Sequence, residues 1–283
     1  MSIAQQICYN GEYFQENIPI LTNRNRAFKY GDSLFETIHA NGTRLQFFED
    51  HFIRLQKGMN TLKMIANSDF NPITIEKEII RLLNKNKLYQ GARIRLSIFR
   101  KDGGFYTPIN NQIDYLIEAT ALELDCYKLN QKGLRIGLFA DISKSINCLS
   151  NLKTSNALLY TLAGIYKTEN NFDDLLITND QGRICEAISS NIFIVKNEEI
   201  YTPSIEEGCV EGIMRKQIIN IAQKNNLSIN YNAKLTKQDL LTADELFFSN
   251  TINAISWVVA YEEQRYFNKI ARFLISELNR IAF

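Results

Sequence analysis

Apolar and polar positions along the first half of the chain predict a hairpin, two helices and several strands. Two short apolar stretches flank Asn10-Gly11, a dipeptide typical of the type I′ turn of a β-hairpin. Residues 49–66 carry apolar side chains three and four positions apart, which predicts an amphipathic helix. Residues 75–88 repeat this spacing after Pro72, a residue favoured at the first position of a helix. Residues 31–40 are expected to form a loop and then a strand, and further strands are expected at residues 93–99 and 113–122.

The second half of the chain also contains both helix-like and strand-like patterns of apolar residues. Residues 175–178 and 184–195 are predicted to form a β-hairpin, and Thr236 with Asp239 has the spacing of a capping box. Further strands are expected at residues 134–140, 245–249 and 255–261, and helices at residues 155–167 and 213–225 and at the C-terminal end. The first of these helices should bury Leu158, Leu159, Leu162, Ile165 and Tyr166, and the last should carry Phe267, Ile270, Leu274, Leu278 and Ile281.

Length and composition indicate a mixed α+β (α/β) protein with two cores. The chain has 283 residues, of which 45% are hydrophobic, enough for one large or two medium domains. We expect a small first domain over residues 1–122 and a polar linker over residues 123–132. A larger second domain is expected over residues 133–283.

Charge and cysteine usage exclude several classes of protein. The net charge is +1, with lysines scattered among acids, so neither nucleic acid nor a membrane is expected as a partner. The N-terminal stretch lacks the pattern of a signal peptide. The five cysteines are widely spaced without a CxxC pair, and His39 and His51 are the only histidines. We therefore expect no metal site and no disulfide framework, and a reducing cytoplasm as the location.

Four sequence features together point to a pyridoxal 5′-phosphate site. Lys153, in Leu152-Lys153-Thr154-Ser155-Asn156, offers an amine that could form a Schiff base, and Glu186 offers a carboxylate for a ring nitrogen. Gly212 precedes a predicted helix, whose free N–H groups suit a phosphate, and Arg54 could add a charge-assisted bond. Thr251, after an apolar strand, could contribute a hydroxyl.

Each feature alone also has a structural interpretation. Lys153 could be a solvated lysine before a helix, and Glu186 an exposed strand residue. Arg54, on the polar side of its helix, could be a surface arginine, and Thr251 an ordinary turn residue. It is the ordered set of features that favours a cofactor site.

Six segments of the chain, in this order and spacing, resemble the fold-type IV pyridoxal phosphate enzymes. This group comprises the class IV aminotransferases and their lyase relatives, and the resemblance runs nearly end to end. The segments are Phe28-Lys29-Tyr30-Gly31-Asp32-Ser33-Leu34-Phe35-Glu36-Thr37, His51-Phe52-Ile53-Arg54-Leu55, Lys153-Thr154-Ser155-Asn156, Glu186-Ala187-Ile188-Ser189-Ser190-Asn191-Ile192-Phe193, Gly212-Ile213-Met214-Arg215 and Ser249-Asn250-Thr251.

The resemblance implies a small N-terminal α/β domain, a larger C-terminal domain and a cofactor in the cleft between them. It also implies a homodimer in which loops of the partner close the substrate pocket. Lys153 matches the Schiff-base lysine and Glu186 the carboxylate for the pyridine nitrogen. The other matching positions are Arg54, Ser190, Asn191, Ile213, Met214 and Thr251 around the cofactor and its phosphate, and Tyr30, Phe35 and Arg95 in the substrate pocket.

Within the group, a few positions resemble 4-amino-4-deoxychorismate lyase. The Lys-x-x-Asn spacing is shared by that lyase and the D-amino-acid aminotransferases, and Leu158 stands where branched-chain aminotransferases have a tyrosine. Met214 replaces the usual threonine, and the Gly103-Gly104-Phe105-Tyr106 loop is lyase-like, although Glu36 departs from some lyases.

The lyase would act through an external aldimine, releasing pyruvate and 4-aminobenzoate. The alternatives are a transaminase that uses a branched-chain or D-amino acid with 2-oxoglutarate, and a pyridoxal phosphate-binding protein without catalysis.

Overall fold

The computed structural model describes residues 5–123 and 126–283, which divide into two compact units. Unit 1 comprises the chain up to Cys126 together with Lys153–Asn156, and unit 2 comprises Tyr127–Leu152 and Ala157–Phe283. Of the expected linker, residues 124 and 125 lie outside the described residues. Its second half is bonded to unit 2: Tyr127 N–H donates to Asn279 Oδ1 at 3.0 Å, and Asn130 Nδ2 donates to the Trp257 carbonyl at 3.0 Å.

An antiparallel six-stranded sheet forms the centre of unit 1, in the order β2-β1-β6-β5-β3-β4. The expected hairpin is confirmed, since β1 and β2 pair from Gln6↔Gln15 to Tyr9↔Glu12. Strands β3 and β5 pair along their whole length, which places the alternate residues of β3 on opposite faces of the sheet. The strands are β1 Gln6–Tyr9, β2 Glu12–Gln15, β3 Ser33–Asn41, β4 Arg44–Leu45, β5 Gly91–Arg100 and β6 Ile113–Ala121.

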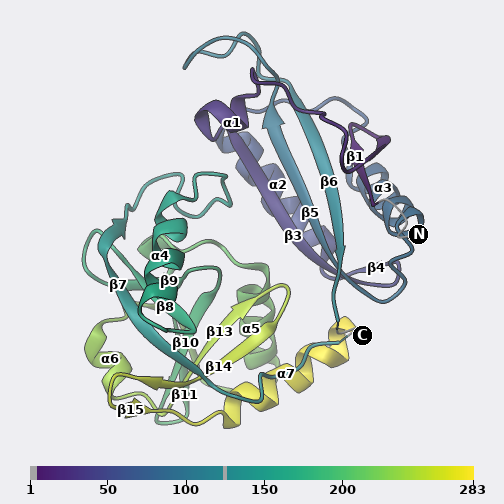
Figure 1. The fold of residues 1–283 in the computed structure, drawn as a ribbon. Coiled ribbons are helices and arrows are strands. Elements are labelled where there is room, and N and C mark those ends of the chain that lie inside the picture. Colours follow the sequence, from purple (N-terminus) through teal and green to yellow (C-terminus); the bar gives the residue numbers. More distant parts are fainter. Residues whose placement is uncertain (1–4, 124–125) are drawn as a thin grey trace. The chain divides into compact units, whose positions relative to one another are not determined.

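Helices α2 (Phe48–Thr61) and α3 (Pro72–Lys85) lie behind this sheet in the view of Figure 1. Helix α2 packs on β3, and α3 packs on β1 and β6. Both predicted helices are confirmed, but α2 ends five residues earlier than expected, because Lys63 takes a left-handed conformation with φ of 54°. A short helix, α1 (Arg26–Tyr30), was not expected; Asn25 caps its start and Gly31, with φ of 64°, ends it.

Unit 2 contains a nine-stranded mixed sheet in the order β12-β11-β10-β13-β14-β7-β8-β9, with β15 paired to β14. The expected strand over residues 184–195 is wrong in one respect, because it breaks into two. Strand β9 pairs with β8 and β10 pairs with β13, with a turn between them closed by a bond from Ala187 N–H to the Ser190 carbonyl. The strands are β7 Leu134–Lys144, β8 Asp174–Asn179, β9 Ile184–Ala187, β10 Asn191–Lys196, β11 Glu199–Pro203, β12 Ile229–Ala233, β13 Glu245–Asn250, β14 Ala254–Tyr261 and β15 Gln264–Arg265.

The helices of unit 2 agree with the predicted ones except at their ends. They are α4 Leu158–Glu169, α5 Ile213–Lys224, α6 Lys237–Leu241 and α7 Lys269–Ala282, with a 3₁₀ turn at Ile205–Glu207. The capping box of Thr236 and Asp239 opens α6 as expected. No helix in the part of the chain that the structure describes is long and apolar enough to cross a membrane.

The predicted buried face of α4 is partly wrong. Leu158 is 79% exposed, and Leu162 and Ile165 are about half exposed. Helix α4 contacts β7 and β8 through a narrower face, made of Ala163 with the partly buried Leu159 and Tyr166. At the last helix, Phe267 precedes α7 and is exposed, whereas Leu274 and Leu278 are fully buried as expected.

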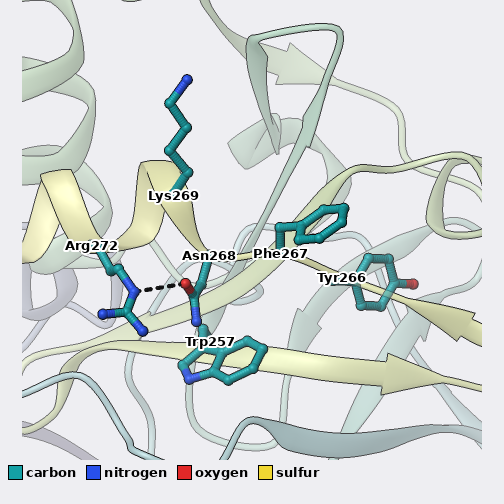
Figure 2. Close-up of a pocket in the computed structure, with 6 residues that line it drawn as sticks. All are labelled: Trp257, Tyr266, Phe267, Asn268, Lys269 and Arg272. Carbon is teal, nitrogen blue, oxygen red and sulfur yellow. Dashed lines mark hydrogen bonds between the residues drawn. The ribbon is translucent and has the colours of Figure 1, made fainter.

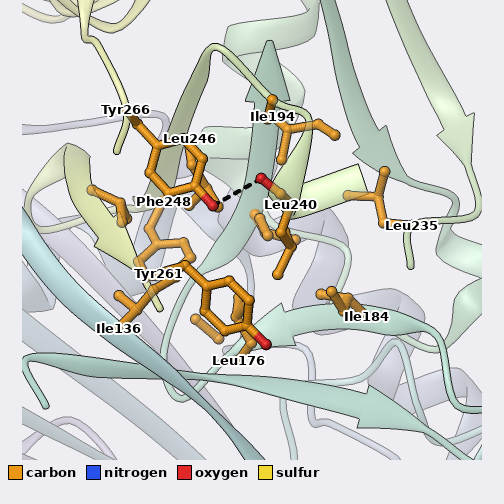
Figure 3. Close-up of a cluster of buried hydrophobic side chains, with 14 of the residues drawn as sticks. Ile136, Leu176, Ile184, Ile194, Leu235, Leu240, Leu246, Phe248, Tyr261 and Tyr266 are labelled. Atoms are coloured by element: carbon orange, nitrogen blue, oxygen red, sulfur yellow. Dashed lines mark hydrogen bonds between the residues drawn. The ribbon is translucent and has the colours of Figure 1, made fainter. Parts of the chain in front are cut away.

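Two hydrophobic clusters on opposite faces stabilise the sheet of unit 2. Leu176 belongs to the larger cluster, which Tyr266 joins with a hydroxyl bond to the Leu240 carbonyl at 3.0 Å (Figure 3). Its neighbours Leu175 and Ile177 belong to the second cluster, under α4, together with Cys185 and Cys209. This alternation, with period two, fixes which residues of β8 and β9 face α4.

Candidate functional site

The segment Lys153–Asn156 pairs with the start of β3 in unit 1. The Phe35 N–H donates to the Lys153 carbonyl at 3.0 Å, and the Ser155 N–H donates to the Ser33 carbonyl at 3.1 Å. The Asn156 side chain donates to the Gly31 carbonyl at 3.1 Å. The helix expected from residue 155 therefore begins later, at Leu158, because these bonds hold residues 153–156 against β3.

Three of the expected residues lie together around one aromatic ring. The Lys153 Nζ lies 4.4 Å from the centre of the Phe35 ring, and the Arg95 guanidinium carbon lies 3.9 Å from it. Arg95 also donates from Nε to Ser97 Oγ at 3.2 Å. The Lys153 and Arg95 side chains thus both lie against one phenyl ring. Tyr30 contacts a different set of residues, with its ring 5.5 Å from the Tyr106 ring and 5.0 Å from the Arg26 guanidinium.

Arg54 is not a surface arginine, contrary to one interpretation of the sequence. Its side chain is 9% exposed, and its Nε and Nη2 donate to the two oxygens of Glu36, at 2.8 and 2.5 Å. Glu36 projects from β3 toward α2, so its carboxylate draws the guanidinium inward. The His51 Nδ1 lies 2.6 Å from Glu36 Oε2. Sequence analysis missed this cluster, in which Glu36 fixes the orientation of Arg54.

The electrostatics of the cluster keep Glu36 ionised and His51 neutral. Burial by itself would raise the pKa of Glu36, but the Arg54 charge and the His51 hydrogen bond outweigh it and hold the pKa at about 2. Burial lowers the pKa of His51, and the Arg54 and Lys153 charges add to this effect against the attraction of Glu36. Nδ1–H therefore donates to Glu36, and Nε2, which has no hydrogen-bond partner among the described residues, carries a lone pair.

Glu186 is a buried carboxylate in unit 2, not an exposed strand residue. It lies on β9, is 3% exposed, and follows a β-bulge at Cys185. Oε1 accepts from Lys144 Nζ and from the Tyr160 hydroxyl, each at 2.5 Å, and Oε2 accepts from the Val210 N–H at 2.8 Å. Lys144 and Tyr160 were not singled out in the sequence, because their contact with Glu186 depends on how β7, β9 and α4 pack.

Helix α5 begins in unit 2 with Gly212, as predicted. Ile213 and Met214, its first two residues, are buried, and Gly212 has no side-chain cap. A Cβ on Gly212 would lie 1.9 Å from the Asn191 side-chain oxygen, so only glycine fits beside this residue. Asn191 is itself fixed by a bond from its Nδ2 to the Val210 carbonyl at 2.9 Å. The start of α5 therefore has no side chain at Gly212, and the first N–H groups of the helix have no partner within the helix itself.

The end of β13 lies beside the start of β10 in the same unit. Ser249 pairs with Asn191, and Asn250 Nδ2 donates to Ser190 Oγ at 3.0 Å. Asn250 also accepts from the N–H groups of Ile252 and Asn253, which shapes the turn that contains Thr251. The buried Ser249 hydroxyl has no hydrogen-bond partner among the described residues.

Arg100, at the end of β5, is buried and hydrogen-bonded within unit 1, whereas the loop that follows it is exposed. Arg100 is 6% exposed; its Nε donates to Asp32 at 2.9 Å and its Nη2 to the Leu62 carbonyl at 2.8 Å. It therefore has a structural role that links β5, α2 and the α1–β3 turn. The loop beyond it carries Phe105 and Tyr106, both more than 80% exposed.

A cavity of about 420 Å³ at the start of α7 contains none of the candidate residues. Figure 2 shows its lining, in which Arg272 Nε donates to Asn268 Oδ1 at 2.8 Å and Lys269 points away from the aromatic side chains. Its residues are Trp257, Tyr266, Phe267, Asn268, Lys269 and Arg272.

The Glu36 cluster predicts a specific loss of stability in acid. The folded-state pKa of about 2 is below the ordinary value of 4.5, so the stabilisation is complete above about pH 4.5 and is lost as pH falls toward 2. Glu36→Gln should lower the free energy of unfolding by about 3 kcal/mol at pH 7 and by about half as much at pH 3.5. Urea unfolding at the two pH values measures this.

The Glu277–Arg280 pair on α7, whose arginine is 72% exposed, provides the control for this experiment. Glu277→Gln should change the free energy of unfolding by less than about 1 kcal/mol at either pH. If Glu36→Gln behaved like this control, Glu36 would not be held as a carboxylate.

Comparisons with known proteins identify relatives of two activities and a shared fold. The chain is 29% identical to the Aquifex aeolicus protein described as "Probable branched-chain-amino-acid aminotransferase", over 89% of this chain and 81% of that protein. It is 26% identical to aminodeoxychorismate lyase of Bacillus subtilis, over 92% of this chain and 88% of that one.

Among solved structures, the chain resembles the branched-chain aminotransferase of Thermoproteus uzoniensis, at a TM-score of 0.88 and 21% identity, covering 98% of this chain and 94% of that one. This likeness confirms the expected fold-type IV architecture. The family model for amino-transferase class IV matches residues 33–261. Because this match spans most of the 283 residues, the chain belongs to the class IV aminotransferase family, whose enzymes use pyridoxal 5′-phosphate.

Proposed function

We propose that this enzyme is a 4-amino-4-deoxychorismate lyase, which releases pyruvate and leaves 4-aminobenzoate for folate biosynthesis. The observation that carries this choice is Met214, 1% exposed at the second position of α5, where an aminotransferase has a threonine. A buried thioether cannot donate a hydrogen bond to a phosphate there, so the backbone N–H is the donor that remains. The Gly103-Gly104-Phe105-Tyr106 loop and the likeness to the Bacillus subtilis lyase support the same choice.

The residues present fit pyridoxal phosphate by three independent observations. Gly212 leaves the start of α5 without a side chain, which suits a phosphate. Glu186 is a buried carboxylate that suits a protonated pyridine nitrogen, and the Ser249 hydroxyl, which no described residue bonds, lies on the strand beside Asn191. When bound, the cofactor supplies an aldehyde that condenses with amines and a ring that withdraws electrons.

In the proposed mechanism Lys153 holds the cofactor and then moves protons. Its carbonyl is bonded to β3 and its amine lies over the face of Phe35, so both ends of the residue are held in place. Lys153 Nζ accepts the proton from the substrate carbon that bears the amine, and the elimination of pyruvate follows. Arg95, on the same ring, is the proposed partner for a substrate carboxylate, with Tyr30 as a further part of the pocket.

The proposed phosphate site combines a charge with backbone donors. Arg54, oriented by Glu36, supplies the guanidinium. Ile213 and Met214 supply N–H groups at the start of α5, and Thr251 supplies a hydroxyl from the turn after β13. Ser190 and Asn191 hold these elements in place through their bonds to Asn250 and Val210.

A transaminase is the second candidate, because the Aquifex aeolicus relative is described as a branched-chain enzyme. The same residues would serve it: Lys153 would return the proton and a keto acid would leave, with 2-oxoglutarate as the second substrate. The two reactions share the removal of a proton by Lys153, so the site residues named above do not distinguish them.

We also propose that the enzyme is a cytoplasmic homodimer. The exposed apolar side chains of Phe105, Tyr106 and Ile109, on the loop between β5 and β6, support the dimer, because such residues are typical of a surface that contacts a partner. The five cysteines are free thiols, and Cys148 is exposed, which supports a reducing compartment.

A substrate panel tests the proposed reaction. The purified enzyme, loaded with pyridoxal phosphate, is incubated with 4-amino-4-deoxychorismate, and separately with leucine, isoleucine, valine or D-alanine plus 2-oxoglutarate. We expect pyruvate and 4-aminobenzoate from the first substrate, at a rate at least about tenfold above any glutamate formation. Faster glutamate formation from an amino acid would establish the transaminase instead. Absence of every product would favour a binding protein without catalysis.

Lys153→Ala should abolish both the covalent cofactor link and turnover. The segment is held through its backbone and through Ser155 and Asn156, so the variant should fold. Turnover should fall by at least about 10³-fold, because both nucleophile and base are lost. Borohydride reduction followed by mass spectrometry detects the link. Lys196→Ala, at a partly exposed lysine bonded to Thr242, is the control. A reducible adduct at normal stoichiometry in Lys153→Ala would assign that role to another lysine.

Gly212→Ala should weaken binding of the cofactor phosphate. The added Cβ displaces the Asn191 side chain and obstructs the start of α5, so we expect a loss of roughly tenfold or more in affinity for pyridoxal phosphate. Titration of the apoprotein by fluorescence measures this. Gly164→Ala is the control, because nothing lies within 4 Å of its added Cβ and alanine favours the helix. If Gly212→Ala and Gly164→Ala bound pyridoxal phosphate with equal affinity, the phosphate would not bind at the start of α5.

A further inference from the structure

Lys144 lies at the end of β7 and contacts the candidate pyridine carboxylate directly. Its Nζ is 2.5 Å from Glu186 Oε1, and the two side chains are 12% and 4% exposed. The same ammonium lies 5.8 Å from the centre of the Tyr160 ring. Nothing in the motifs of the chain assigns this lysine a role, yet it is the cation of a buried ion pair.

The hydrogen bonds to Glu186 leave its carboxylate able to accept one more hydrogen bond. An ionised carboxylate has about four acceptor positions, two on each oxygen. Lys144 and Tyr160 occupy those of Oε1, and the Val210 N–H occupies one on Oε2. No other donor among residues 5–123 and 126–283 bonds to Oε2, so its remaining position can accept an N–H from a ligand. The arrangement therefore holds the carboxylate with one oxygen fully used and the other available.

Several titratable groups surround Glu186. The Lys144 ammonium is the positive charge in direct contact with its carboxylate. Tyr160, from α4, is neutral, because burial and the Glu186 charge raise its pKa far above the ordinary value. Burial likewise raises the pKa of the thiols of Cys185, on β9, and Cys209, before α5, which keeps both uncharged. Arg215 is bonded elsewhere, to the Pro203 and Tyr231 carbonyls at 2.8 and 2.9 Å. A carboxylate buried among neutral groups binds a proton readily unless a cation compensates it.

We propose that Lys144 is a positioning residue that keeps Glu186 ionised and directs its remaining acceptor position to the ring nitrogen of the cofactor. Tyr160 assists by donating a hydrogen bond to the second acceptor position of Oε1. The inference rests on the proposed function of Glu186. It gives this chain two lysines with separate tasks, Lys153 for the reaction and Lys144 for the carboxylate that polarises the ring.

The test begins with the apoprotein, so that it does not depend on catalysis. In Lys144→Met the buried carboxyl loses its cation, so we expect it to bind a proton in the folded state, whereas in the solvated unfolded chain it is ionised at neutral pH. The stability of this variant should therefore fall as pH rises from 5.5 to 8, relative to wild type. We expect an additional loss of melting temperature of about 2 °C or more over this range.

Three further variants assign the effect to the pair. Lys144→Arg should restore the wild-type pH dependence, because it keeps the charge. Lys144→Met/Glu186→Gln should remove the additional loss, because no carboxyl remains to titrate. Lys196→Met, at the partly exposed lysine bonded to Thr242, should behave as wild type. If Lys144→Met showed the wild-type pH dependence, or if the double variant kept the loss, the role of Lys144 would be refuted.

A second readout separates this inference from the proposed function of Glu186. The absorbance of the bound cofactor is titrated with pH in wild type, Lys144→Met and Glu186→Gln. Both variants should shift the midpoint of the titration, and Lys144→Arg should not. A shift in Glu186→Gln alone would overturn the role of Lys144 and leave that of Glu186 intact. An unchanged titration in Glu186→Gln would overturn the proposed function of Glu186, and with it the assignment of its free acceptor position to the ring.

Discussion

The backbone pairing of Lys153–Asn156 with the start of β3 is the interaction on which the candidate site depends. It takes a four-residue piece of chain, flanked on both sides by unit 2, and makes it part of the antiparallel structure of unit 1. A lysine amine on a free loop would have many orientations, whereas here the main chain on either side of Lys153 is fixed. The conformational entropy of this segment is therefore lost once, when the chain folds. In the proposed function it would not have to be lost again in each turnover.

Two buried carboxylates organise the two units, and each is compensated by a cation. Glu36 is paired with Arg54 in unit 1, and Glu186 with Lys144 in unit 2. Removing either cation would leave a charge in a place of low polarity, which costs far more than an exposed ion pair is worth. The pairs differ in geometry: Arg54 meets both oxygens of Glu36, whereas Lys144 meets one oxygen of Glu186 and leaves acceptor capacity on the other. This difference suits Glu36 to orient a neighbour and Glu186 to receive a ligand.

Small residues at the site are explained by what lies against them. Gly31 takes a φ of 64°, and a Cβ there would lie 2.6 Å from the Asn156 side-chain oxygen. Gly212 has an ordinary conformation, but its Cβ would overlap Asn191. The motifs Gly31-Asp32 and Lys153-Thr154-Ser155-Asn156 are therefore parts of one contact, and so are Ser190-Asn191 and Gly212-Ile213.

The sequence by itself determined most elements, such as the first hairpin, α3 after Pro72 and the capping box of α6, because turn residues and apolar spacing act locally. Its motifs also led to the family. Only the tertiary structure decided that Lys153 lies on a strand edge, that the strand after Ile184 breaks near Ser190, and that α4 leaves Leu158 exposed. It also showed that Glu36 pairs with Arg54 and that Lys144 pairs with Glu186. Each of these depends on a partner far away in the chain, and local spacing carries no information about such partners.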